Sequence, residues 1–173
     1  MTKTQHNINH GLIAGLVATV ILSILMITKA STGLMPKMDV INMLTQLSHN
    51  LIHTPSNSFV GWVIHFVIGT FVWGALFALF AKQWKMPNYT VKGVSFATLA
   101  WLLMMVVLMP AVGAGLFGVK LGMSVAVGTL LMHWVYGSVL GSIYGALDRE
   151  EQISKDQASP SHGTTGRPGH THT

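Results

Sequence analysis

The sequence predicts an all-α integral membrane protein with four transmembrane helices and one amphipathic helix outside the membrane. Only 9% of the 173 residues are Asp, Glu, Lys or Arg, against roughly 25% in an average soluble domain. Half of the residues are hydrophobic and the mean hydropathy is +0.52. This is more apolar surface than a chain of this length can hide in its own core. We therefore expect the lipid bilayer to be a partner of the chain.

Each of the four predicted spans has a core without a charged residue. These cores cover the roughly 17–25 residues that a helix needs to cross the hydrocarbon layer. None of them alternates in polarity, which excludes the strands of a membrane barrel. The predicted spans are residues 10–30, 57–82, 91–110 and 121–147.

The basic residues predict the orientation of these spans. Six of them, near the ends of the spans, fall on the side of the N-terminus: Lys3, Lys82, Lys85, Lys92, Arg149 and Lys155. Three fall on the opposite side: Lys29, Lys37 and Lys120. Because basic loops stay in the cytoplasm, we expect both termini to be cytoplasmic and the protein to lie in a bacterial inner membrane.

The long segment between the first two spans contains a predicted amphipathic helix over residues 38–53. Apolar residues recur there at helical spacing, namely Val40, Ile41, Leu44 and Leu51. Asn42, Gln46, His49 and Asn50 form the opposite, polar face. We expect this helix to lie at the outer membrane interface with its apolar face toward the bundle or lipid.

The transmembrane domain is predicted to end at residue 147. Residues 148–173 contain many Ser, Thr, Gly and Pro residues and few apolar ones. Such a segment cannot bury enough apolar surface to offset its ordering entropy, so we expect a disordered polar tail.

A weak internal repeat relates the second and fourth spans. The segment His65-Phe66-Val67-Ile68-Gly69-Thr70 matches His133-Trp134-Val135-Tyr136-Gly137-Ser138 in its His, aromatic, Val, Gly and hydroxyl positions. The first and third spans also align, with Gly11 on Gly93. The pattern predicts two tandem two-helix hairpins related by an axis along the membrane normal.

The repeat singles out His65 and His133 as candidate cofactor-binding residues. Ionisable side chains in a span are costly against lipid, so both imidazoles are expected to face the interior at similar depth. Such a pair has the chemistry to ligate haem b or a transition metal, to bind a quinone head group or to pass protons. The alternative interpretation is helix packing, with each histidine bonded to a neighbouring hydroxyl or carbonyl group.

The remaining polar residues do not form a recognisable catalytic set. No nucleophile triad, nucleotide-binding loop or paired carboxylate occurs, and the predicted spans contain no acid; the acids are Asp39, Asp148, Glu150, Glu151 and Asp156. The chain has no cysteine, which excludes disulfides and thiolate metal sites. Because no catalytic set occurs, we expect no enzymatic activity. The chain also has no basic block, so we expect no nucleic-acid partner.

Four short motifs give the chain a resemblance to a known family. They are Gly11-Leu12-Ile13-Ala14-Gly15, Gly33-Leu34-Met35-Pro36, Gly61-Trp62-Val63-Ile64-His65 and Trp101-Leu102-Leu103-Met104-Met105. Over residues 10–147 the chain resembles small bacterial four-span membrane proteins that carry a domain of unknown function. The resemblance implies an architecture and assigns no activity to any residue.

These observations favour a structural or accessory subunit of the inner membrane that joins a membrane complex or a homo-oligomer. The first alternative is a haem- or metal-binding redox protein that uses His65 and His133. The second alternative is a small channel or carrier. The colour of the purified protein distinguishes the structural subunit from the haem protein, because only the haem protein has a Soret band.

Overall fold

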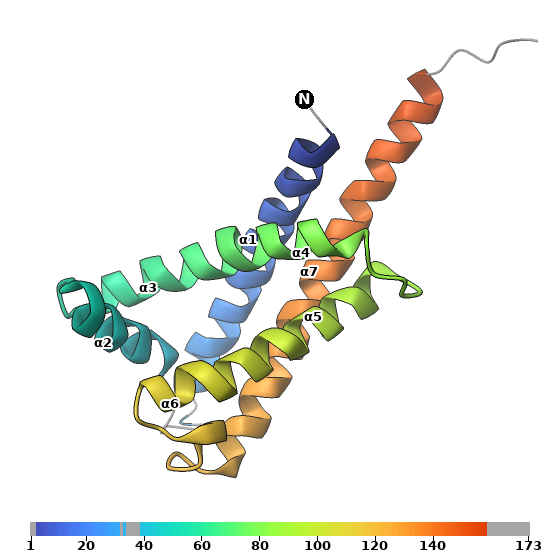
Figure 1. The fold of residues 1–173 in the computed structure, drawn as a ribbon. Coiled ribbons are helices and arrows are strands. Elements are labelled where there is room, and N and C mark those ends of the chain that lie inside the picture. Colours follow the sequence, from blue (N-terminus) through green and yellow to red (C-terminus); the bar gives the residue numbers. More distant parts are fainter. Residues whose placement is uncertain (1–2, 32, 34–38, 159–173) are drawn as a thin grey trace, which may run out of the picture.

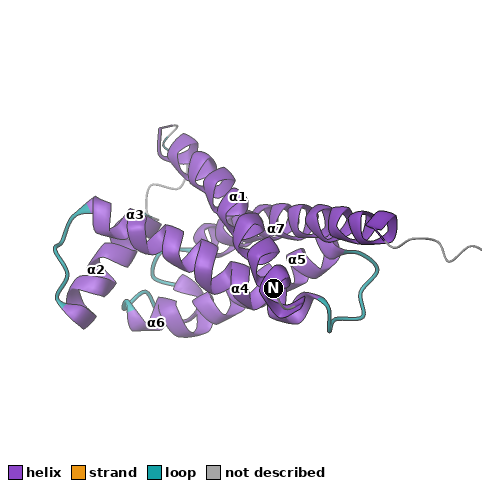
Figure 2. Ribbon diagram, turned by 90° about the horizontal axis from the view of Figure 1, so that it is seen from above, coloured by secondary structure: helices purple, strands orange, loops and turns teal. Residues whose placement is uncertain are grey.

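The computed structural model describes residues 3–31, 33 and 39–158. Every regular element in this part of the chain is a helix, which confirms the all-α fold class (Figure 2). Four helices are long and apolar enough to cross a membrane: Gln5–Ser31, Ser58–Ala81, Tyr89–Ala111 and Met123–Ala158. The predicted number of spans is therefore confirmed.

Two of the four spans are uninterrupted α-helices and two contain a π-helical segment. The first span lies in α1 (Lys3–Ser31) and the fourth in α7 (Met123–Ala158). The second consists of α3 (Ser58–Phe66), the π-helix η1 (Val67–Trp73) and α4 (Gly74–Ala81). The third consists of α5 (Tyr89–Leu103), the π-helix η2 (Met104–Leu108) and α6 (Met109–Ala111). A short 3₁₀ helix, η3 (Leu116–Gly118), precedes α7.

Side-chain caps define where several helices begin. Asn57 and Asn88 accept hydrogen bonds from the backbone N–H groups of Val60 and Val91, so the second and third spans start at those asparagines. Asp39 caps α2 (Val40–Ile52) in the same way, through the N–H of Asn42.

Helix α2 lies where the sequence predicted an amphipathic helix over residues 38–53. Its buried face consists of Ile41, Leu44, Thr45 and Ser48, whereas Asn42 and Gln46 are exposed. The helix ends when His53 adopts a left-handed conformation with φ of 56°, two residues before Pro55. Leu51 is 69% exposed, so it faces away from the bundle and is available to lipid.

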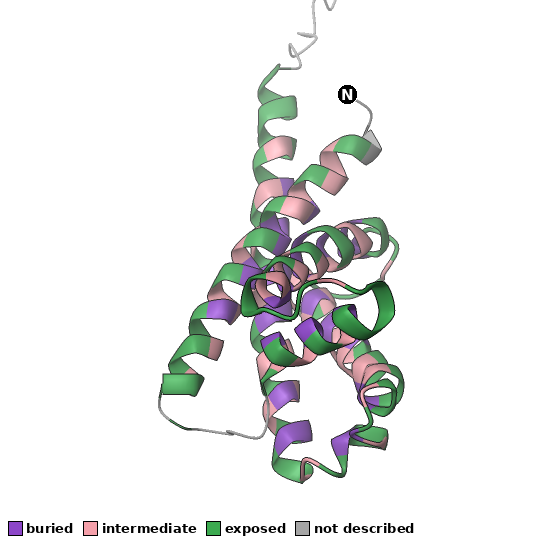
Figure 3. Ribbon diagram, turned by 90° about the vertical axis from the view of Figure 1, so that its left-hand side faces the viewer, coloured by how far each residue is buried: buried purple, intermediate pink, exposed green. Residues whose placement is uncertain are grey.

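The spans cross one another where glycines let two backbones touch. In Figure 1, the span formed by α3 and α4 runs across α1, and α5 packs on α7. A Cβ atom on Gly11 would overlap the carbonyl oxygen of Gly74, and one on Gly93 would overlap that of Gly137. Figure 3 shows buried residues at these crossings and exposed ones on the outward faces. Small residues thus set the spacing of both helix pairs.

An aromatic cluster fills the space between the crossings. Phe77 contacts Phe96 and Tyr144 edge to face, with ring centroids 5.5 and 5.4 Å apart. Tyr144, Phe77 and Leu140 are almost completely buried. The core therefore joins α4, α5 and α7.

The two ends of the bundle are built from different segments. At one end lie the start of α1, the connection 82–88 and the end of α7. Asp148 of α7 binds Lys82 at 3.0 Å and Tyr89, the first residue of α5, at 2.9 Å, and Glu151 of α7 faces His6 and His10 of α1. We call this end the termini side. The opposite end carries α2 and residues 111–122, and we call it the α2 side.

The expectation that residues 148–173 form a disordered tail is wrong for residues 148–158. The apolar part of α7 ends at Leu147, but the helix continues to Ala158. Asp148 is buried and held by Lys82, and Lys155 pairs with Glu151 one turn earlier. Extending an existing helix also avoids the nucleation cost that an isolated segment would have. Residues 159–173 lie outside the described residues.

Candidate functional site

His65 is buried at the interface between the first two spans. Its Nε2 atom lies 3.2 Å from the hydroxyl of Ser23 on α1. The edges of its ring contact Trp62 and Phe66, with centroids 5.7 and 5.8 Å away. The side chain is only 8% exposed, so His65 faces the interior as predicted.

His133 has a different environment from His65. It lies on α7, is only partly buried, and donates a hydrogen bond from Nδ1 to the carbonyl oxygen of Thr129 in the same helix, at 2.8 Å. Within the described residues, no interaction joins the rings of His65 and His133. Their assignment as a ligand pair, and the tandem repeat that suggested it, stay predictions.

A second polar contact crosses the interior close to His65. Tyr136 of α7 donates a hydrogen bond of 2.6 Å to the carbonyl oxygen of Gly69, which lies in η1. The adjacent Thr70 hydroxyl is buried and has no hydrogen-bond partner among the described residues. The sequence offered no sign of the π-helix, whose altered hydrogen-bond pattern accompanies this contact.

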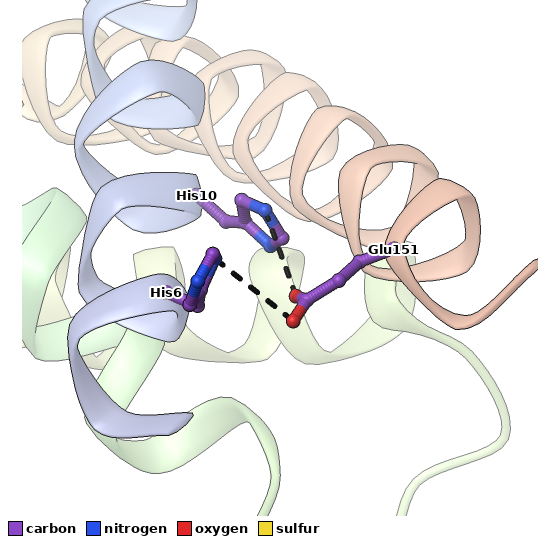
Figure 4. A group of neighbouring side chains, drawn as sticks. All are labelled: His6, His10 and Glu151. Carbon is purple, nitrogen blue, oxygen red and sulfur yellow. Dashed lines mark ion pairs between the residues drawn. The ribbon is translucent and has the colours of Figure 1, made fainter. Parts of the chain in front are cut away.

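The structure brings together a cluster that the sequence did not predict. His6 and His10 of α1 point toward the carboxylate of Glu151 on the polar extension of α7 (Figure 4). His6 Nδ1 lies 3.9 Å from Glu151 Oε1, and His10 Nε2 lies 3.8 Å from Glu151 Oε2. One nitrogen or oxygen from each of the three residues lies within 4.8 Å of the others.

The immediate surroundings of this cluster are partly closed. The side chains of His10 and Glu151 are 13% and 18% exposed, and that of His6 is 42% exposed. Lys155 donates a hydrogen bond to Glu151, and its ammonium group lowers the pKa of that carboxyl below the ordinary value. The Nδ1 atom of His10 is buried, and no group in residues 3–31, 33 or 39–158 forms a hydrogen bond with it.

Part of this cluster was visible in the sequence. His6 and His10 are four residues apart, which places them on one face of a helix. Glu151, however, was assigned to the disordered tail, so no third residue stood beside them. Helix continuation to Ala158 was the missing information.

A groove of about 520 Å³ lies on the α2 side. One wall is the part of α2 that carries Asn42, Gln46 and Asn50, and the other is the segment 111–114 together with Lys120 and Leu121. Its polar lining residues are Asp39, Asn42, Gln46, Asn50 and Lys120. Met43, Leu47 and Val112 provide an apolar floor, which also borders a small apolar pocket against Met104 and Met109.

Comparison with known proteins identifies one family. Residues 5–155 match a family described as "Family of unknown function (DUF6789)". No curated protein and no solved structure matches the chain.

Proposed function

Because the chain belongs to the DUF6789 family, whose function is unknown, we propose its role from its own geometry. We propose that it is an accessory subunit of a bacterial inner membrane that binds a partner protein on the α2 side. The groove beside α2 is the observation that carries this proposal.

The outward faces of the spans support residence in a bilayer. Large apolar side chains are exposed on all four spans, for example Ile24 at 58%, Phe71 at 58%, Leu99 at 55% and Leu131 at 53%. In water such surfaces would drive aggregation, whereas lipid tails are as apolar as these side chains and can cover them. The excess of basic residues on the termini side supports cytoplasmic termini.

The lining of the groove favours a peptide segment as its occupant. Asn42, Gln46 and Asn50 repeat at four-residue spacing on the exposed face of α2. Each amide has both donor and acceptor groups, which match the alternating groups of a peptide backbone; one N–H of Gln46 is used by its hydrogen bond of 3.4 Å to Ser56. The groove volume lies within the range of about 300–1,000 Å³ that is typical of ligand sites.

The charges of the groove argue against a lipid phosphate as the occupant. Asp39 and Lys120 contribute one charge of each sign. Asp39 already caps α2, and Lys120 donates a hydrogen bond of 2.9 Å to the carbonyl oxygen of Gly113. The groove thus lacks the cluster of basic residues that recruits anionic head groups.

Site-specific photo-crosslinking in intact membranes tests this proposal. A photo-reactive residue at Gln46 should give a discrete adduct with one protein, and the same residue at His49 should not, because His49 is exposed on α2 outside the groove. The protein in the adduct should also co-purify with the unmodified chain, and less of it should co-purify after Asn42→Ala and Asn50→Ala.

Three outcomes would contradict the proposal. They are equal labelling from Gln46 and His49, adducts with lipid alone, and adducts with a second copy of this chain. Orientation is tested separately with two reporters fused after Ala158. A reporter that works only in the cytoplasm should be active, and one that works only in the periplasm should be inactive.

A further inference from the structure

We propose that His6, His10 and Glu151 form a binding site for a divalent transition-metal ion, at the termini side where α1 meets the polar extension of α7. This site shares no residue with the groove beside α2, which lies on the opposite, α2 side.

The three side chains converge without satisfying one another. The contacts of 3.8 and 3.9 Å between the imidazole nitrogens and the carboxylate oxygens are too long for hydrogen bonds, which span about 2.7–3.2 Å. His10 Nε2 is therefore not hydrogen-bonded to Glu151, and within the described part of the chain its buried Nδ1 has no hydrogen-bond partner. Figure 4 shows both imidazole rings next to the Glu151 carboxylate, from two successive turns of α1.

The spacing is close to that of a metal site. Bonds of about 2.1 Å in a tetrahedral ion hold neighbouring ligand atoms about 3.4 Å apart. The present atoms all lie within 4.8 Å of one another, so a bound ion would have to draw them closer by at most about 1.4 Å. His6 is 42% exposed and has room for such a movement.

The donor set defines the class of ion. Two imidazoles and one carboxylate suit zinc and related first-row divalent ions, and they leave a fourth position for water. Glu151 supplies a negative charge that partly neutralises the ion. The i, i+4 spacing of the histidines puts both nitrogens on the same side of α1, as in helical zinc sites.

Lys155 is the internal competitor of the ion. Its ammonium donates to Glu151 and must move away before both carboxylate oxygens are free. Lys155 is 62% exposed, so its displacement into water requires no change in packing. Removing the positive charge of Lys155 should therefore strengthen metal binding. If Glu151 served only as an ion-pair partner of Lys155, this change would not affect metal affinity.

Metal titration of the full-length protein in detergent tests the site. The tail histidines His162, His170 and His172 are first replaced by alanine in all variants, and the affinity tag contains no histidine. We expect about one Co²⁺ or Zn²⁺ per chain, with the Co²⁺ absorption bands of a nitrogen and oxygen site. His49→Ala is the matched control, because His49 and His53 also form an i, i+4 pair.

The variants have opposite expected effects. His6→Ala and Glu151→Gln should each weaken Zn²⁺ binding at least about tenfold, and His49→Ala should leave it unchanged. Lys155→Met should tighten binding about twofold, which is the size expected for an exposed i, i+4 ion pair. Zn²⁺ should also raise the thermal midpoint of the parent protein but not that of Glu151→Gln.

Other results would overturn the proposal. Unchanged Zn²⁺ affinity in both His6→Ala and Glu151→Gln would do so, as would weaker binding in Lys155→Met. If a variant is misfolded, circular dichroism shows it, and the Lys155→Met result then decides, since that exposed substitution removes no packing contact.

Discussion

Removal of one hydroxyl group from Tyr89 tests how the termini side is held together. Tyr89 donates a hydrogen bond of 2.9 Å to Asp148 Oδ2, and Lys82 binds Oδ1 at 3.0 Å. A hydrogen bond to a charged group contributes about 1.5–3 kcal/mol. Gln152 also donates to Oδ2, at 3.0 Å, and limits the loss. We therefore expect Tyr89→Phe to lower the free energy of unfolding by about 1 kcal/mol.

Tyr144→Phe is the matched control for this substitution. The rings of Tyr144 and Tyr89 lie 5.2 Å apart in the same cluster, but the Tyr144 hydroxyl is buried without a hydrogen-bond partner. Its removal leaves no acceptor unsatisfied and takes away a buried unpaired hydroxyl, so the free energy of unfolding should stay the same or rise.

Thermal unfolding in detergent, followed by circular dichroism, measures both effects. For a chain of this size, about 1 kcal/mol corresponds to a shift of about 2–4 °C in the midpoint. The reasoning is refuted if the two variants shift the midpoint equally, or if Tyr89→Phe behaves like the parent protein. Either result would mean that Asp148 is not stabilised by the Tyr89 hydroxyl.

Three further predictions address the helix crossing, α2 and the histidine pair. Gly93→Ala should cost about 2–3 kcal/mol because its Cβ would overlap Gly137, whereas Leu99→Ala on the lipid face should cost less than about 0.5 kcal/mol in the same unfolding assay. Asp39→Ala removes the cap of α2 at a cost of about 1 kcal/mol, so amide exchange should accelerate at the start of α2 and stay unchanged in α7. The predicted haem pair requires a Soret band that His65→Ala or His133→Ala removes. If the protein is colourless and His65→Ala destabilises it, the role of the His65 ring is structural, through its contact with Ser23.

Much of the fold follows from properties that the sequence shows directly. Inside the bilayer no water is present to bind backbone N–H and C=O groups, so these groups form hydrogen bonds within the segment. A long charge-free stretch is therefore a helix. The amphipathic pattern of α2 was equally direct, because Ile41 and Leu44 share a face. The π-helices η1 and η2 were not predictable, since they depend on how neighbouring spans constrain the ladder of hydrogen bonds.

The candidate site was predictable only in part, for reasons of geometry. His65 and His133 occupy equivalent places in the sequence pattern, yet one bonds to another helix and the other to its own. The partner of each histidine depends on the rotation of its helix about the helix axis, and a match over six residues does not specify that rotation. His6 and Glu151 are 145 positions apart, so their proximity depends on the packing of the first helix on the last.

The continuation of α7 past the apolar section determines how far from the bilayer its end lies. Residues 148–158 rise about 1.5 Å each as a helix, which makes the polar extension a rod about 16 Å long. The extension is anchored at its base by Asp148, which binds Lys82. A group joined after Ala158 would therefore be held away from the lipid head groups, at a distance fixed by a stiff spacer.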